Sequence, residues 1–168
     1  MNRVSAALGS IVFFFLAPGT VAGLVPWWIS GWTAQVPLLD VEPVRMGGAA
    51  LISAGLIVLI DSFRRFAMDG LGTPAPVLPT KHLVVSGWYR HVRNPMYVAV
   101  VALILGQALM FSDWRLLAYA AAVWLGFHVF VTQYEEPTLR ATFGEDYEVY
   151  CRAVGRWWAR LTPWDAQS

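Results

Sequence analysis

Cysteine and charge are both scarce in this sequence of 168 residues. A single cysteine, Cys151, excludes an internal disulfide and a zinc site built from cysteines. Charged residues make up only 14% of the chain and hydrophobic residues 57%, with a mean hydropathy of +0.51, so an ordinary soluble domain is excluded. The net charge of +1 provides no basic surplus for nucleic acid. We therefore expect an integral membrane protein with no metal site and no nucleic-acid partner.

Four hydrophobic runs predict an all-α protein with four transmembrane helices, because about 20 apolar helical residues cross about 30 Å of hydrocarbon. A cleaved signal peptide is the alternative for the first run, which has a basic start; we expect a retained helix. After the fourth run, apolar residues recur every three or four positions between charges, which predicts an amphipathic helix on the membrane surface. The predicted single membrane domain, residues 1–168, has transmembrane helices at about 4–28, 44–64, 97–111 and 115–134, a loop at 67–96 and the amphipathic helix at about 138–154.

The basic residues are distributed unevenly along these predicted spans. If four spans alternate, all but two of the 12 Lys and Arg residues fall on one side of the membrane, and Arg45 and Arg115 fall on the other. Cytoplasmic segments carry the excess of Lys and Arg. We therefore expect both termini and the loop at 67–96 to be cytoplasmic.

A polar segment, residues 86–97, leads into the third run. Pro95 fits the first turn of a helix, and Asn94 just before it can cap that helix. The helix start then presents free N–H groups beside Arg93, which together favour binding of a carboxylate or a phosphate. Contact of this basic loop with anionic lipid headgroups is the alternative.

Two adjacent carboxylates, Glu135 and Glu136, follow the fourth run. At a helix C-terminus they oppose the helix dipole, and their burial is costly unless a cation neutralises them. We therefore predict a pocket for a cationic ligand; the alternative is that both side chains reach water beside Arg140. By this reasoning, replacing either glutamate with Gln should leave the free protein at least as stable.

His128 lies within the fourth run, seven residues before Glu135, so the two residues are expected to share a helix face. An ionisable residue inside a span is a functional candidate, and His128 is the candidate general base. A neutral histidine that is hydrogen-bonded to a neighbouring helix is the alternative. Arg140, beside the glutamates, is the second candidate catalytic residue.

Three stretches of the C-terminal half stand out as motifs: Gly87-Trp88-Tyr89, Arg93-Asn94-Pro95-Met96-Tyr97, and Glu135-Glu136 followed by Leu139, Phe143-Gly144, Tyr147 and Tyr150. Together they resemble the motifs of the membrane-embedded methyltransferases, a superfamily that includes isoprenylcysteine carboxyl methyltransferases and phosphatidylethanolamine N-methyltransferases. The resemblance covers about residues 80–155 and implies S-adenosylmethionine as cofactor, with methyl transfer to a lipophilic or lipidated acceptor at the cytoplasmic membrane interface. The cofactor-binding residues that it implies are Gly87, Tyr89, Arg93, Asn94, Pro95, Tyr97, Glu135 and Glu136.

Different parts of the sequence resemble different branches of this superfamily. The segment 134–137 looks like the phospholipid enzymes, whereas the segment 143–150 looks like the isoprenylcysteine group. Asn94 stands where the isoprenylcysteine enzymes usually have His, and no Gly-x-Gly follows the Asn-Pro pair as it does in the phospholipid enzymes. The acceptor therefore stays open between a prenylated thiol or carboxylate, a phospholipid amine and another lipophile.

Two other functions are compatible with the predicted topology. Sterol reductases, which use NADPH, have a related C-terminal region, although their chains are much longer. A non-catalytic membrane scaffold or lipid-binding protein would also contact membrane lipids. Neither a scaffold nor a lipid-binding protein requires the Arg-Asn-Pro loop to be paired with a double glutamate.

Overall fold

The computed structural model describes residues 3–34, 42–69 and 82–165, and over these ranges the regular secondary structure is helical. The predicted all-α class is confirmed. Much of the predicted loop, residues 70–81, lies outside the described residues. In chain order the elements are α1 (Arg3–Leu16), the π-helical turn η1 (Thr20–Leu24), α2 (Val25–Ser30), α3 (Glu42–Met68), the 3-10 turn η2 (Gly87–Arg90), α4 (Pro95–Phe111), α5 (Trp114–Phe130), the π-helical turn η3 (Val131–Glu135), α6 (Glu136–Phe143) and α7 (Glu145–Ala153).

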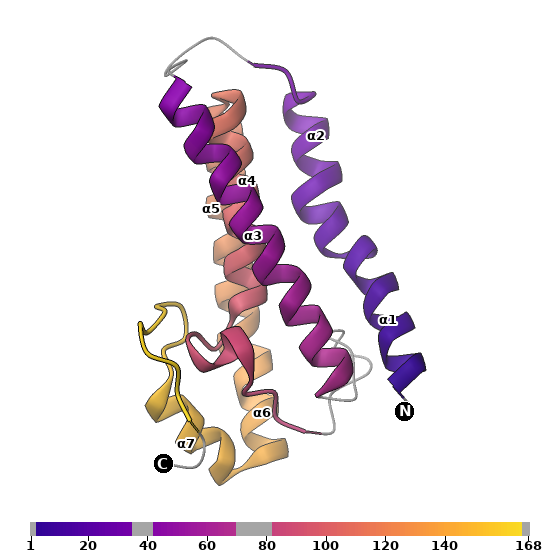
Figure 1. Cartoon of the computed structure of the whole chain (residues 1–168), viewed down its shortest axis with the longest axis vertical. Helices are drawn as coiled ribbons and strands as arrows, with labels where there is room; N and C mark the ends of the chain where they lie inside the picture. The colour runs from indigo at the N-terminus through magenta and orange to yellow at the C-terminus, as the bar shows by residue number, and fades with distance from the viewer. Residues whose placement is uncertain (1–2, 35–41, 70–81, 166–168) are drawn as a thin grey trace.

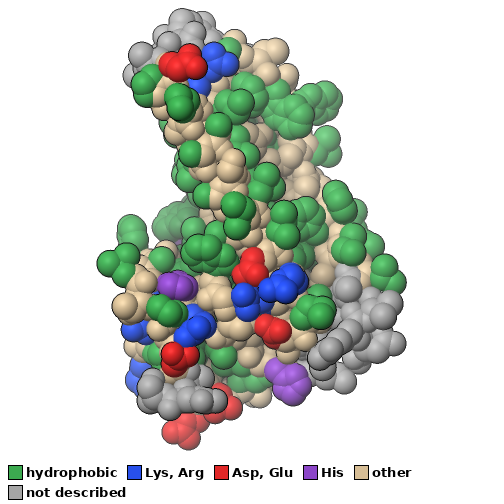
Figure 2. Space-filling view, viewed as in Figure 1, with side chains coloured by type: hydrophobic (Ala, Val, Ile, Leu, Met, Phe, Trp, Pro, Cys, Tyr) green, Lys and Arg blue, Asp and Glu red, His purple; other side chains and the backbone are tan. Residues whose placement is uncertain are grey.

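Three helical segments are long and apolar enough to cross a membrane: Leu8–Ser30, Glu42–Met68 and Trp114–Phe143. The apolar helix α4 has 17 residues, a length of about 25 Å, which is shorter than the roughly 30 Å of hydrocarbon in a bilayer. By length, three of the four predicted spans therefore qualify. The segments form an elongated bundle in which α7 and the start of α1 lie at the same end, called the α7 end below (Figure 1). Charged side chains gather toward this end, with a smaller group at the opposite end (Figure 2).

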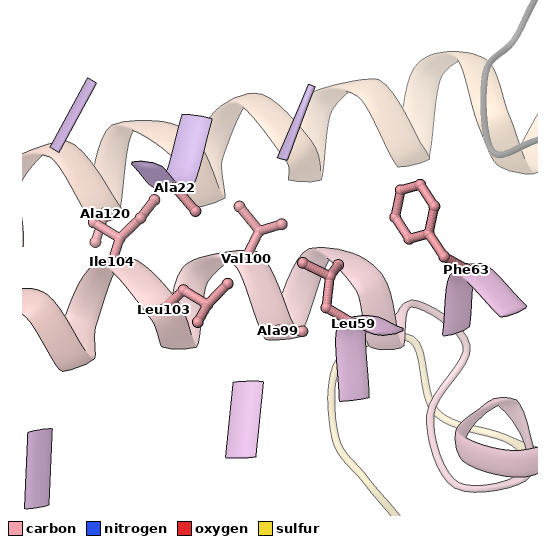
Figure 3. Packing of buried hydrophobic residues seen from close by; sticks show 8 residues of the cluster. All are labelled: Ala22, Leu59, Phe63, Ala99, Val100, Leu103, Ile104 and Ala120. Carbon is pink, nitrogen blue, oxygen red and sulfur yellow. The ribbon is translucent and has the colours of Figure 1, made fainter. Parts of the chain in front are cut away.

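Helix α4 packs closely against α3 because small residues face each other. A Cβ at Gly48 would lie 2.7 Å from the carbonyl oxygen of Gly106, and a Cβ at Gly106 would lie 2.8 Å from the carbonyl oxygen of Gly48. Helices in membranes associate through such small residues, which let their backbones approach. Buried side chains of α3, α4, α5 and the first segment complete the core: Ala22, Leu59, Phe63, Ala99, Val100, Leu103, Ile104 and Ala120 (Figure 3).

Each π-helical turn ends two residues before a proline: η1 before Pro26 and η3 before Pro137. A proline inside a helix lacks the N–H donor, and its ring clashes with the carbonyl four residues earlier, a strain that a wider turn relieves. In the first segment, the carbonyl of Ala22 accepts a hydrogen bond from Gln107 Nε2 instead, at 2.8 Å. The helix at Pro137 continues into α6, so the predicted end of the fourth helix at residue 134 is wrong.

The predicted amphipathic helix over residues 138–154 is divided in two. Helix α6 ends at Phe143, and Gly144 has a φ of +53°, a left-handed conformation that glycine adopts without steric cost. Helix α7 then begins at Glu145 and buries Tyr147 and Tyr150. A single surface helix over this range is therefore wrong, and α7 packs into the end of the protein instead.

Candidate functional site

A cavity of about 230 Å³ lies toward the α7 end, between the first helical segment, α3, α4 and the α5–η3 helix. Most of its wall is aromatic or aliphatic. It brings together five of the residues predicted to bind a cofactor: Tyr89, Arg93, Asn94, Tyr97 and Glu135. The rest of its lining is apolar: Phe13, Ala17, Pro18, Val21, Leu59, Phe63, Phe66, Met96, Val100, Phe127 and Phe130.

Glu135 provides the negative charge of this cavity. Its Oε2 accepts a hydrogen bond of 2.7 Å from the Tyr97 hydroxyl, and the Tyr97 ring lies against Phe127 with a centroid distance of 4.7 Å. Within the described parts of the chain, Glu135 forms no ion pair. A half-buried carboxylate without a cation is costly to hold in an apolar surrounding. A positively charged ligand group would complete its coordination.

Arg93 provides the opposite charge, and its guanidinium is only partly satisfied. Nη1 lies 2.6 Å from Cys151 Sγ and 3.2 Å from Glu136 Oε1, whereas the buried Nε has no hydrogen-bond partner among the described residues. The side chain is 11% exposed. An unpaired buried N–H is costly, and the Arg93 side chain also lines the cavity. A carboxylate without a cation and an arginine with one unsatisfied donor thus belong to the lining of the same cavity.

Glu136 lies outside the cavity and is saturated with arginines. Arg156 forms a bidentate pair with it, at 2.6 and 2.8 Å, and Nη1 of Arg140 lies 3.8 Å from it. With Arg93, three guanidinium groups surround a carboxylate that is 4% exposed. The hydrogen bond to Glu136 raises the pKa of Arg156. The two glutamates thus face different surroundings, because consecutive helical residues are about 100° apart. The stability expectation for Glu136 is reversed, since removing its charge removes three cation contacts.

His128 does not reach the cavity. It lies between Trp124 and Trp157, with ring centroid distances of 5.4 and 6.1 Å, and its Nδ1 accepts a hydrogen bond of 3.2 Å from Trp157 Nε1. The expected shared face with Glu135 is not formed, because the wide turn η3 adds about one residue and rotates the following helix by about 100°. Arg140 is also outside the cavity, where its Nε donates to Glu148 at 2.6 Å.

Gly87, Asn94 and Pro95 shape the loop that forms one wall. Gly87 has a φ of +55°, a left-handed conformation that favours glycine, and it packs against the guanidinium of Arg65. Pro95 is in the first turn of α4, as expected. The predicted cap by Asn94 is wrong, because its Nδ2 donates instead to the carbonyl of Arg156, at 3.1 Å.

The role of the tail, residues 154–165, was not predicted from the sequence. The backbone of the tail is hydrogen-bonded to the loop that precedes α4. The N–H groups of Arg160 and Trp164 donate to the carbonyls of His91 and Arg90, each at 2.9 Å. Such backbone pairing leaves no side-chain pattern in a sequence. The one available signal is the set of arginines after residue 151, which are complementary in charge to Glu136.

A second contact fixes the same loop to helix α7. The hydroxyl of Tyr150 on α7 donates to the backbone carbonyl of Tyr89, at 2.7 Å. Burial raises the pKa of both phenols, so both remain neutral at physiological pH. The tail and α7 together fix the loop that carries Arg93.

The structure is that of a membrane protein, an apolar helical bundle with a cavity at one end whose lining includes one acidic and one basic side chain. Residues 44–146, more than half of the chain, match the model of the phospholipid methyltransferase family. The chain therefore belongs to this family, and the resemblance to the membrane methyltransferases is confirmed. The matched range includes both charged residues of the cavity, Arg93 and Glu135. No curated protein matches the chain.

Proposed function

We propose that the protein transfers a methyl group from S-adenosylmethionine to a lipophilic acceptor at the membrane interface. The observation that carries this proposal is that Glu135, a carboxylate without a cation, and Arg93, an arginine with an unsatisfied donor, line the same cavity. S-adenosylmethionine has an ammonium and a carboxylate on the same carbon, so its amino-acid part is complementary to both groups. When bound, it supplies a methyl group on a positively charged sulfur.

The residues of the cavity fit this cofactor in three ways. Glu135 would accept a hydrogen bond from the ammonium, and the Tyr97 hydroxyl holds the Glu135 carboxylate in place. Arg93, whose Nε has no partner among the described residues, would bind the carboxylate of the cofactor. Aromatic rings such as Phe127 and Phe130 attract the sulfonium through their negative faces and exclude water from the site. NADPH would need several cations for its phosphates, whereas Arg93 is the single cationic side chain among the described residues that line the cavity.

Methyl transfer requires mainly alignment of the acceptor atom with the methyl group. The loop that carries Arg93 and Asn94 is fixed by the tail, so the cavity wall is positioned before a ligand binds. An ionised thiol or carboxylate needs no base, and an ammonium acceptor must first lose a proton. We assign positioning roles to His128 and Arg140, which hold Trp157 of the tail and Glu148 of α7.

Binding of S-adenosylhomocysteine tests the assignment without requiring the acceptor. Glu135→Gln and Arg93→Lys should each weaken binding by about ten- to a hundredfold, the loss of one charge-assisted hydrogen bond. Glu145→Gln is the matched control, because Glu145 is exposed and does not line the cavity. Affinity is measured by calorimetric titration in detergent. Parental affinity in both cavity variants, or stabilisation by NADPH in place of S-adenosylhomocysteine, would remove the basis of the proposal.

We further propose that all four helical segments cross the membrane with the α7 end in the cytoplasm. Helix α4 runs beside α3, and its C-terminal end reaches the end of the bundle opposite α7 (Figure 1). Arg93 and Arg156 lie at the α7 end, and Arg45 and Arg115 near the starts of α3 and α5 at the other end, which fits the positive-inside rule. A reporter enzyme fused after Ser168 should be active in the cytoplasm; a signal from the opposite side would contradict this orientation.

A further inference from the structure

The tail presents apolar side chains outward and turns its charged groups inward. Trp158 and Leu161 are 88% and 99% exposed. Arg160, between them, turns its charge back onto the protein, where Nη1 donates to the last carbonyl of α7 at 3.1 Å. The guanidinium of Arg156 is held in the same way by Glu136. A loop that faces water shows the reverse arrangement, and an exposed apolar surface of this kind marks a contact with a membrane or a protein.

Trp157 places this part of the tail beside α5. Its Nε1 donates to His128 Nδ1 at 3.2 Å, and its ring centroid lies 6.4 Å from that of Trp124. His128 comes seven residues before Glu135, about 10 Å along the helix at 1.5 Å per residue. In Figure 1 the tail, coloured yellow, runs from α7 back along the side of the bundle. The exposed tryptophan and leucine therefore follow a residue that lies closer to the middle of the bundle than the two glutamates do.

The outer surface of α5 is apolar at this level. Leu125 and Val129 are exposed there, within a segment that is long and apolar enough to cross a membrane. On the side of the molecule where the tail lies, hydrophobic side chains project above the charged ones (Figure 2). Exposed apolar residues of a spanning helix face lipid, and Trp is enriched at the level of the headgroups. The apolar side of the tail therefore continues the lipid-facing surface of α5.

We propose that Trp158 and Leu161 insert into the bilayer at the boundary between headgroups and hydrocarbon, so that the lipid surface is the partner of the tail. The N–H groups of Arg160 and Trp164 are already bonded to the loop, which lowers the cost of irregular backbone near hydrocarbon. The same bonds connect the inserted side chains to the loop that carries Arg93. The bilayer thereby supports one wall of the cavity from outside, whichever ligand the cavity binds.

Cysteine accessibility tests this proposal without any ligand. The protein is placed in nanodiscs of phosphatidylcholine, one copy per disc, and treated with a charged maleimide that does not enter lipid. The thiol of Leu161→Cys should react at least about tenfold more slowly than that of Glu145→Cys, because the reactive thiolate is disfavoured in an apolar surrounding. Glu145→Cys is the matched control, since Glu145 is exposed at the start of α7. The rate of Cys151 in the parent is subtracted, and after denaturation both variants should react equally.

A fluorescent bimane attached to the thiol of Leu161→Cys identifies what covers it. Phosphatidylcholine with bromine atoms near the ester end of one acyl chain should quench this bimane, and should leave a bimane on Glu145→Cys unquenched. Trp158→Cys gives the same measurements if Leu161→Cys does not fold, since both side chains are exposed. Reaction of Leu161→Cys as fast as the control shows a tail in water and overturns the proposal. Slow reaction without quenching shows that protein covers the tail, and overturns it as well.

Discussion

Two regions of this protein use the same residue types in opposite ways. The packed region consists of the contact between Gly48 and Gly106 and the cluster of arginines about Glu136. The open region consists of the cavity and of a second hollow, the apolar groove, which lies between the first helical segment and helices α3 and α4. Glu135 lies in the wall of the cavity and Gly23 in the wall of the groove. Each region thus has a glutamate and at least one glycine.

The surroundings decide what each residue does. In the packed region, a glycine lets two backbones touch and a carboxylate is neutralised by three guanidinium groups. In the open region, Gly23 leaves a space and Glu135 has one phenol as its partner. Satisfied groups stabilise the free protein, and unsatisfied groups are available to a ligand at a cost in stability. Substitutions in the two regions should therefore separate stability from binding.

The largest expected effect on stability is at Glu136. Glu136→Gln leaves the guanidinium groups of Arg93 and Arg156 without their anion, which should lower the free energy of unfolding by about 3 kcal/mol. This value is at the lower end for a broken buried pair, because Arg156 is 34% exposed. Glu135→Gln should change stability by less than about 1 kcal/mol, since the amide oxygen still accepts the Tyr97 hydrogen bond. Unfolding in detergent, followed by circular dichroism, measures both values.

The same pair of variants should behave differently toward S-adenosylhomocysteine. Glu135→Gln should stay folded and bind it weakly. Glu136→Gln should be less stable, and its binding should weaken because Arg93 loses the carboxylate that holds it in place. Equal losses of stability in the two variants would show that the two glutamates are equivalent. The division into a packed and an open region would then fail at this position.

The sequence predicted those parts of the fold that depend on local composition. Hydrophobic runs identified the helical segments, and the placement of Pro95 in the first turn of α4 was confirmed. The continuation of the last long helix past Pro137 was missed, because a wide turn that accommodates a proline has no hydropathy pattern. That turn also rotates Glu135 away from His128, so the assumption of a regular helix gave the wrong shared face.

The candidate site was predictable where motif and position agreed. Arg93, Tyr97 and Glu135 were named from the motifs and line one cavity. The different roles of the two glutamates depend on Arg156, which comes from a tail that pairs with the loop through backbone hydrogen bonds. The groove depends on what is absent, the side chains of Gly19 and Gly23, and small residues in a membrane helix equally predict close packing.

The smaller stability effect concerns two neighbouring glycines of α3. In Gly48→Ala the new Cβ would lie 2.7 Å from Gly106 O and 2.9 Å from Met110 N, backbone atoms that move only if the helices separate. We expect a loss of about 1–3 kcal/mol in the free energy of unfolding, as for overpacked cores. Gly47→Ala is the control, because its Cβ would meet nothing within 4 Å and alanine favours a helix over glycine by about 1 kcal/mol. Its stability should therefore stay the same or increase.

Neither variant touches the cavity, so the folded fraction of both should bind S-adenosylhomocysteine like the parent. If Gly48→Ala is as stable as Gly47→Ala, the contact between α3 and α4 is not closely packed, and the contrast with the open groove at Gly23 has no basis.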